Sequence, residues 1–579
     1  MRNARRPSTW ELSPTPRADA VDRPEIQRRT LVRDLVVLGV ATLVIRLINL
    51  DHTVFIDELN HIIAASSLLA EGNLEMPGGS EYTRARFLTY LVAFSYLIFG
   101  ESIVSARVPS VVAGTAMVLV LFAWVWRVAG RSSAWIAALL FALTPQAIYH
   151  AQIARMYSFQ GLFVLLTAWA SYEIVVKNAL SRRATLLLGS AAVLGALLSL
   201  AAQISSIVGL SAIAGWIAFV GGASPRGRRF LSQVSTKWLL GGVLTVAIIG
   251  ALVVQSGFPS RALVLFRHSD LWASGPEETV MYYHYSFWEH FPLFWSIFPI
   301  LALLALARRF YAASLWVATF SLIFLVHSFA AWKADRYVFY SLPFFFALCG
   351  VALGPAIQWI FREIQTLARP LQPSMATRVI ATIVLIFAVA FALRNNPGYR
   401  YALDMVTGDD TSWTHERPYR GEANWRALAE VVEEGLDSFE VLVGSTEPKA
   451  NYFLGRSDYT LSVNDLATGH GALNEFSRSA RSGGLIISRP ESLAWVMDCH
   501  ATGLIVIEQN RWRQFWGVTD DAADLIEVRT SRMDLPSGWR IRAYTWHRAD
   551  QPKAAGQTAG CTPPDSLREA VPVIPEHGR

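Results

Sequence analysis

The feature that most constrains this chain is a series of long apolar runs between Leu31 and Arg394, separated by short polar loops. A helix that crosses a bilayer needs about 20 predominantly apolar residues. Charged residues make up 17% of the 579 residues, against roughly 25% in a soluble protein. The chain is therefore predicted to be a polytopic α-helical membrane protein. About eleven spans are expected, starting as 31–50, 104–126, 132–150, 156–176, 184–202 and 204–222, and continuing as 238–256, 290–307, 311–331, 337–361 and 379–394.

The distribution of Lys and Arg sets the expected orientation. With eleven spans and residues 1–30 as a basic cytoplasmic tail, every dense basic cluster falls on the inner side, as the positive-inside rule requires. Phe87–Gly100 is short for a span, and counting it would invert all that follows, so it is expected to lie at the interface. The net charge of +6 thus reports topology, and no nucleic-acid partner is expected. The inner clusters are Arg127 and Arg131; Lys177, Arg182 and Arg183; Arg226, Arg228, Arg229 and Lys237; Arg308 and Arg309; and Arg362, Arg369 and Arg378.

Three regions are predicted to lie on the outer face: the loops 51–103 and 257–289, and everything after about residue 395. Residues 31–394 then form the membrane domain, and 395–549 an extracytoplasmic α/β domain, because a helical stretch at Trp425–Leu436 is followed by short β-rich runs. Residues 550–579 are expected to be disordered. Cys499 and Cys561 fit either a disulfide or two free thiols. The expected strands are 441–443, 460–463, 484–487, 504–508, 525–528 and 541–546.

Two adjacent carboxylates, Asp57 and Glu58, follow the first span directly. A general base beside a second acid in a partly dehydrated cleft is one interpretation. The structural alternative is that Asp57 caps a helix over Glu58–Ala70 that ends at Gly72. Both can hold, because a capping residue is held rigidly.

Basic residues are few on the predicted outer face. A set of them that runs against the positive-inside trend suits a lipid phosphate, the commonest anion at that surface. Snorkelling or ordinary loop charge is the alternative for any single member. The candidates are Arg155, Lys333, Arg336, Arg84 and Arg86.

The loop before the span at 290–307 is rich in aromatic residues and includes His284 and Trp288. Such residues normally form an interfacial belt, with stacking on a sugar as the alternative. The sequence offers no ligand set for a metal, and no glycine-rich nucleotide motif.

Several of these motifs together resemble the GT-C superfamily of polyprenyl-phosphate-sugar-dependent glycosyltransferases, most of all the protein O-mannosyltransferase and aminoarabinose-transferase-like branch. The resemblance rests on the order of the motifs along the chain. In place of the Lys-Pro-Pro run frequent in this branch, the chain has Thr83-Arg84-Ala85-Arg86-Phe87. The motifs are Asp57-Glu58, Phe99-Gly100, Ala106-Arg107-Val108-Pro109-Ser110, Ala154-Arg155-Met156-Tyr157 and Lys333-Ala334-Asp335-Arg336-Tyr337.

The resemblance implies an outer-face transferase that moves a sugar from a polyprenyl phosphate to a hydroxyl acceptor, with inversion. Asp57 would take the proton from the acceptor, and Glu58 would orient Asp57 or bind substrate. The basic set would stabilise the leaving phosphate. Tyr157, His284, Trp288 and Tyr337 are expected to contact substrate. Some relatives carry a divalent metal, so the resemblance also allows a divalent metal as a cofactor.

Three other functions stay open from the sequence alone: a lipid or glycan transporter or flippase, a ligase for lipid-linked oligosaccharides, and a scaffold that presents the α/β domain. A transporter predicts mid-membrane charges and an internal repeat. The visible intramembrane charges, Arg46 and Glu173, lie near span ends, and no repeat is apparent. No Asn-x-Ser/Thr sequon occurs, which disfavours a eukaryotic secretory-pathway origin. The expected location is a bacterial inner membrane.

Overall fold

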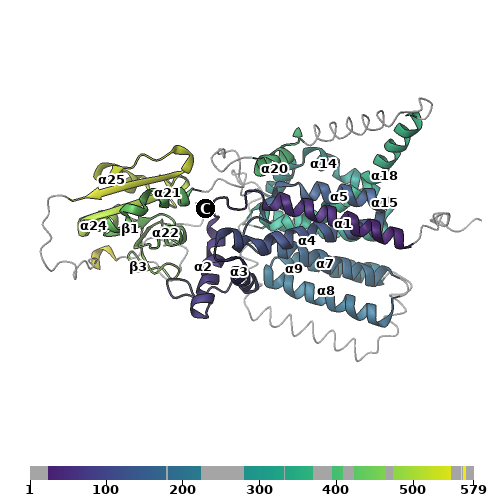
Figure 1. The fold of residues 1–579 in the computed structure, drawn as a ribbon, viewed down its shortest axis with the longest axis horizontal. Helices are drawn as coiled ribbons and strands as arrows, with labels where there is room; N and C mark the ends of the chain where they lie inside the picture. Colours follow the sequence, from purple (N-terminus) through teal and green to yellow (C-terminus); the bar gives the residue numbers. More distant parts are fainter. Residues whose placement is uncertain are drawn as a thin grey trace, which may run out of the picture.

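The computed structural model describes residues 24–177, 180–222, 279–330, 333–368, 394–407, 423–463, 474–548, 563 and 565–568. A bundle of long helices packs at one end of the molecule, and a smaller domain with a mixed sheet lies at the other (Figure 1). This is the predicted class of fold. The expected spans 238–256 and most of 379–394 lie outside the described residues, so the count of eleven stays a prediction.

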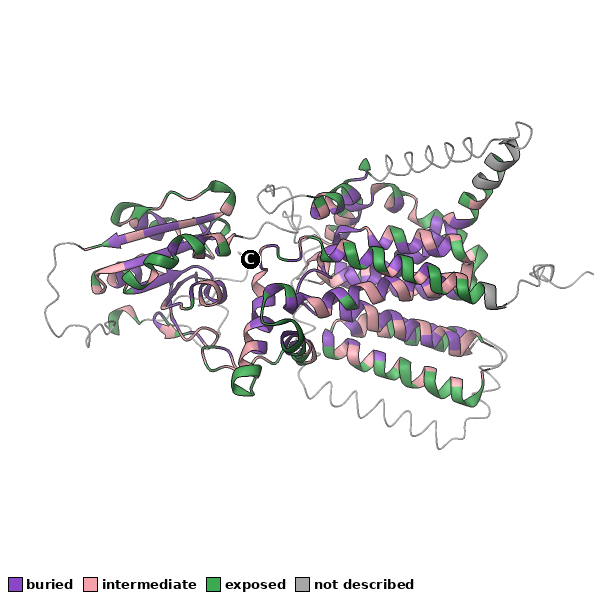
Figure 2. Cartoon of the chain, viewed as in Figure 1, coloured by how far each residue is buried: buried purple, intermediate pink, exposed green. Residues whose placement is uncertain are grey.

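The helical part agrees with the apolar runs found in the sequence. Five of its helices, α4, α7, α8, α16 and α17–α18, are long and apolar enough to cross a membrane. Exposed residues lie along many of the bundle helices (Figure 2), and they include many large apolar ones, as on lipid-facing helices. The helices are α1 (Pro24–Leu47), α2 (Ile56–Glu71), α3 (Arg86–Phe99), α4 (Ile103–Ala129), α5 (Arg131–Ala142), α6 (Pro145–Tyr149), α7 (Tyr157–Val176), α8 (Arg182–Ala202), α9 (Ser206–Trp216) with a π-turn at Ile217–Gly221, α13 (Tyr282–His290), α14 (Pro292–Ser296), α15 (Phe298–Arg308), α16 (Phe310–Ser328), α17 (Asp335–Val338) with a 3-10 turn at Phe339–Ser341, α18 (Leu342–Ala368) and α20 (Pro397–Thr407).

The C-terminal domain is a seven-stranded sheet in the order β3-β4-β2-β1-β5-β7-β6. Strands β4, β2, β1 and β5 are parallel, whereas β3, β7 and β6 join antiparallel at the edges. The strands are β1 (Val441–Gly444), β2 (Tyr459–Leu461), β3 (Ser477–Arg478), β4 (Leu485–Ile487), β5 (Thr502–Glu508), β6 (Ser531–Arg532) and β7 (Ile541–His547). The helices are α21 (Trp425–Val432), α22 (Glu447–Leu454), α24 (Pro490–Cys499) and α25 (Asp520–Arg529), with 3-10 turns at Glu433–Ser438, Gln509–Arg511, Ser537–Trp539 and Asp565–Leu567.

Alternating side chains of β5 serve two cores. Leu504 and Val506 pack with α21 and α22, while Ile505 and Ile507 pack with α24 and α25 on the other face. Such alternation is what a strand buried on both faces produces. Cys499 is disulfide-bonded, and Cys349 is a free buried thiol in the helical core.

One predicted strand is wrong. Residues 525–528 lie in helix α25, whose first turn is capped by the Thr519 hydroxyl. Ala522, Ala523 and Ile526 are buried from that helix, and their spacing is helical although the sequence after them is β-rich.

The segment between α2 and α3 joins the two parts of the molecule through hydrogen bonds to main-chain carbonyls. The amide of Gly78 donates to the carbonyl of Arg481 at 2.9 Å, and the amide and hydroxyl of Ser80 donate to the carbonyl of Ala480 at 3.3 and 2.6 Å. A Cβ atom at Gly78 would lie 2.4 Å from the Ala480 main chain. Only glycine permits this approach, so this loop contact, between 76–80 and 479–483, depends on Gly78.

Candidate active site

The start of α2 places the two adjacent carboxylates. The cap residue is Phe55, whose amide donates to Oε1 of Glu58 at 2.8 Å. Asp57 is the second residue of the helix, so the expectation that Asp57 itself caps it is wrong. A carboxylate three residues after the cap satisfies an orphan amide there, which leaves the Asp57 side chain available for other contacts. Gly72 ends the helix in the left-handed conformation, as expected.

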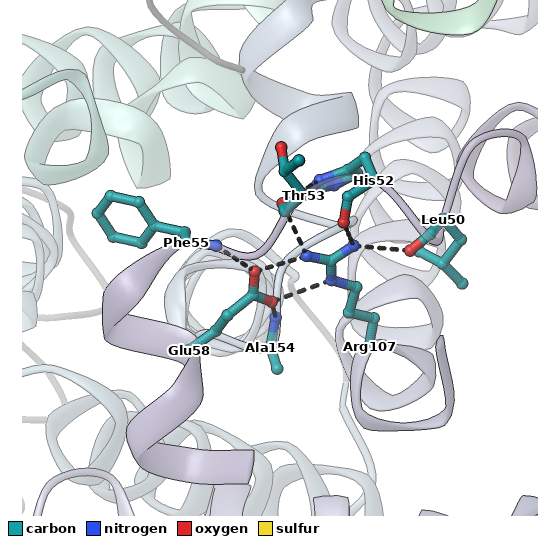
Figure 3. Close-up of polar contacts among 7 residues, drawn as sticks. All are labelled: Leu50, His52, Thr53, Phe55, Glu58, Arg107 and Ala154. Carbon is teal, nitrogen blue, oxygen red and sulfur yellow. Dashed lines mark hydrogen bonds and ion pairs between the residues drawn. The ribbon is translucent and has the colours of Figure 1, made fainter. Parts of the chain in front are cut away.

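Glu58 forms a closed, fully buried ion pair with Arg107 of α4 (Figure 3). Nε and Nη2 of Arg107 donate to the two carboxylate oxygens at 3.0 and 2.6 Å. The amide of Ala154 donates to Oε2 of Glu58 at 2.9 Å. The remaining Arg107 hydrogen bonds go to the carbonyls of Leu50, His52 and Thr53. This pair therefore ties α2, α4, the loop after α1 and the loop before α7 together.

Asp57 contacts a different arginine, Arg155. Nη2 of Arg155 lies 3.1 Å from Oδ2 of Asp57, and Nη1 donates to the Asp57 carbonyl at 3.0 Å. The Arg155 side chain is 1% exposed and that of Asp57 32% exposed. Asp57 thus combines a buried cation on one side with access from outside on the other.

Arg155 also contacts Tyr157, the first residue of α7. Nη2 donates to the phenol oxygen at 3.4 Å, and the guanidinium lies 5.6 Å from the ring centroid. Burial alone would lower the pKa of Arg155, but Tyr157 and Asp57 more than offset this and raise it. The residue is a permanent cation.

The segment 333–337 brings a second group to the same place. The charge of Arg336 interacts with Tyr157 and Asp57, and its guanidinium lies 5.2 Å from the Tyr337 ring. Nζ of Lys333 donates to the carbonyl of Ala330 at 2.7 Å. The structure thus brings together Asp57, Arg155, Tyr157, Arg336 and Tyr337 from three separate stretches of the chain.

Helix α13 holds this segment through residues other than the two expected ones. Tyr283 exchanges hydrogen bonds with the main chain of Ala334, and Ser286 donates to Asp335 at 2.7 Å. His284 instead accepts from Trp295 and stacks near Trp288, which is exposed. Within the described residues, no contact links His284 or Trp288 to Asp57 or Arg155, and the belt interpretation suits them better.

The two arginines before α3 lie at the rim. Arg86 pairs with Glu81 at 2.8 Å, both exposed. Arg84 is exposed too, but its charge acts on His61 and Tyr82. Of the two, Arg84 is the one directed to the site.

His61, one turn after Asp57 on α2, is a buried residue that the sequence did not single out. Its Nδ1 lies 2.9 Å from the Thr89 hydroxyl and its Nε2 3.3 Å from the Tyr82 hydroxyl. Burial lowers the pKa of His61 well below its usual value, and the charges of Arg155 and Arg84 lower it further. The helical spacing Asp57-x-x-x-His61 is the signal that could have found it.

Charges from both parts of the molecule act on Tyr82. Burial raises the pKa of Tyr82, and among the charges that act on it are Arg155, Arg84 and Asp57, together with Arg481 of the loop contact.

The sequence named Arg107 only as part of a family motif and gave it no role. In the structure Arg107 is the partner of Glu58. Among the residues that the structure describes, no three His, Cys, Asp or Glu side chains gather as metal ligands.

Comparisons with known proteins agree with the fold. The family model described as "Dolichyl-phosphate-mannose-protein mannosyltransferase" matches residues 84–254. The fold is similar to ArnT from Cupriavidus metallidurans bound to undecaprenyl phosphate, with a TM-score of 0.57 and 16% identity over 93% of this chain and 100% of that one. The apo state of that protein gives a TM-score of 0.54, with 17% identity over 90% and 98% of the two chains.

A third similar structure is the archaeal oligosaccharyltransferase AglB from Archaeoglobus fulgidus in complex with an inhibitory peptide and a dolichol-phosphate. Its TM-score is 0.51, with 13% identity over 91% of this chain and 75% of that one. No curated protein matches the sequence.

The described residues combine a bundle of long apolar helices with an attached α/β domain, the architecture of the ArnT and AglB structures. The chain's fold is shared with ArnT and with the oligosaccharyltransferase AglB.

Proposed function

We propose that this enzyme transfers a sugar from a polyprenyl phosphate to a hydroxyl acceptor at the outer face of a bacterial inner membrane, with Asp57 as general base and inversion at the anomeric carbon. The observation that carries the proposal is the half-buried Asp57 carboxylate in contact with the buried Arg155 cation, beside Tyr157 and Arg336. This arrangement combines, in one site, a carboxylate that an acceptor can reach and two cations that can bind a phosphate.

The reaction follows from these groups. The acceptor oxygen forms a bond to the anomeric carbon while its proton passes to Asp57. The bond from that carbon to the phosphate oxygen breaks, and the polyprenyl phosphate leaves with an added negative charge. Attack opposite the leaving group inverts the carbon.

The Asp57–Arg155 ion pair couples the two ends of this reaction. When Asp57 takes the proton it loses its charge, so Arg155 no longer has an anionic partner. At the same moment the leaving phosphate gains charge, and the Arg155 and Arg336 guanidinium groups can stabilise it without rearrangement. Glu58 acts as a positioning residue, because both of its oxygens are already occupied by Arg107, Phe55 and Ala154.

Lys333 and Arg84 complete the proposed set of phosphate-binding residues. Lys333 lies on the same segment as Arg336, and Arg84 on the same segment as Tyr82. Tyr157 and Tyr337 each lie beside one of the two central arginines. They are the residues placed to contact the donor. The proposed reaction uses residues of the chain only, and none of its steps requires a metal.

Thermal unfolding of the purified protein with undecaprenyl phosphate tests the proposal. Ligand at 100 times its Kd stabilises a native state by about 2.7 kcal/mol, so a clear rise in Tm is expected. Arg336→Ala should lose this rise, whereas Arg426→Ala, an exposed arginine beside Asp51, should keep it. Stabilisation by a diphosphate-linked oligosaccharide alone, or by no polyprenyl lipid, contradicts the proposal.

A further inference from the structure

His150 is a buried residue of the helical domain for which the mechanism above has no role. It follows the short helix α6, and its side chain lies between the two segments that form the site. Its ring centroid is 5.1 Å from that of Tyr157 and 4.5 Å from that of Phe339. His150 is 2% exposed. The residue therefore contacts both the Arg155 side and the Arg336 side of the site.

Both ring nitrogens of His150 lack a hydrogen-bond partner within the described part of the chain. Its main chain, in contrast, is paired, since its carbonyl accepts from the Ser158 hydroxyl at 2.8 Å and its amide donates to Gln146 at 3.0 Å. Buried polar atoms are almost always paired, because each unpaired one costs about 1–3 kcal/mol. A buried ring with both nitrogens unpaired indicates a partner that is not part of the chain.

The charges around His150 indicate the nature of that partner. Arg336 and Arg155 are the two charged residues that act on its ring. Burial, and then the two neighbouring cations, favour the neutral imidazole, which carries one N–H donor and one acceptor nitrogen. An anion attracted by the two arginines is then the group that meets the His150 N–H.

We propose that His150 is a further donor-binding residue, whose ring N–H donates to a phosphate oxygen held between Arg155 and Arg336. The proposal rests on the function proposed above. A neutral donor in this place fixes the orientation of the phosphate without adding a third positive charge beside Asp57, which must keep its ability to accept a proton.

The test compares His150→Phe and His150→Gln in thermal-shift titrations with undecaprenyl phosphate and, separately, with inorganic phosphate. His150→Phe should weaken undecaprenyl phosphate binding by about tenfold or more, the effect of losing a hydrogen bond to a charged group. His150→Gln keeps an N–H donor and should bind within about threefold of wild type. An equal loss for inorganic phosphate means that the phosphate alone is recognised; a loss for the lipid only means that the lipid-linked form is needed. Both results support the assignment.

Stability without ligand separates binding from a structural role. Removing unpaired buried nitrogens should leave the ligand-free Tm of His150→Phe unchanged or higher, whereas a structural histidine would lower it. The control is His500→Phe, a partly buried histidine of the α/β domain that also contacts a tyrosine ring, that of Tyr459 at 5.9 Å. If His150→Phe does not fold, His150→Leu replaces it because it needs less space.

Undiminished lipid binding by a folded His150→Phe or His150→Leu protein overturns this inference and leaves the proposed function standing. Absence of binding by the wild-type protein overturns both.

Discussion

Asp57 and Glu58 are adjacent in the chain, yet their carboxylates pair with different arginines and differ in exposure. Glu58 is fully buried against Arg107, and Asp57 reaches outward from Arg155 with a third of its side chain exposed. One residue of helical rotation separates a group that holds the structure from a group that is available for chemistry. The consequences of that division can be measured.

Asp57→Asn should reduce sugar transfer by about 10²–10⁴-fold, the usual contribution of a general base. Binding of undecaprenyl phosphate should be unchanged or tighter, since Arg155 loses an anionic competitor. Transfer rate and lipid-dependent Tm are the two measurements. Asp51→Asn, an exposed carboxylate earlier in the same loop, is the control. Near-normal turnover of Asp57→Asn would refute the assignment of the base.

Glu58→Ala and Arg107→Ala should each destabilise the protein by about 3–5 kcal/mol, because either change leaves a buried charge without its partner. The double substitution Glu58→Leu with Arg107→Met should cost less than the sum of the single changes. Thermal unfolding in detergent gives these differences. Arg86→Ala breaks an exposed pair with Glu81 and should cost only about 0–1 kcal/mol. If Glu58→Ala and Arg107→Ala destabilise the protein no more than Arg86→Ala does, the buried pair does not contribute to stability.

The loop contact depends on Gly78. Gly78→Val places side-chain atoms where Ala480 main chain lies, so the hydrogen bonds to residues 480 and 481 should break. We expect faster proteolysis near residue 480 and lower transfer activity. The decrease in Tm should be small, because only the hydrogen bonds of this contact are lost. Gly435→Ala, which meets no neighbouring atom, is the matched control. Equal proteolysis of the two variants would mean that the contact contributes little in solution.

His61 should make stability depend on pH. Burial, followed by the charges of Arg155 and Arg84, lowers the pKa of His61 in the folded state, whereas in the unfolded chain it is about 6.5. The unfolded state therefore binds the proton first, and the stability present above about pH 6.5 is lost as the pH falls. His61→Gln should flatten the decrease of Tm between pH 7 and pH 5. Tyr82→Phe keeps the imidazole buried and should retain it. The same slope in His61→Gln and wild type would contradict the prediction.

The sequence by itself determined the class of fold and singled out Asp57 as the candidate acid. Apolar runs of this length predict membrane-spanning helices, and the helical bundle agrees with them. The short β-rich runs predicted the α/β domain, and the mixed sheet agrees with them. Asp57, Arg155 and Arg336 could be chosen because carboxylates and cations at the predicted membrane surface need a reason to be there. The strand expected at 525–528 was wrong because local β propensity is weaker than a cap and a buried helical face.

Only the tertiary structure decided which of these residues act together. The separation of Asp57 from Glu58 depends on Arg107, which lies 49 positions away from Glu58 along the chain. The placement of His61, Tyr82 and His150 depends on packing between helices and loops far apart in sequence. Pairing at such separations is set by which side chains share a buried, low-dielectric volume, and no local pattern of residue types carries that information.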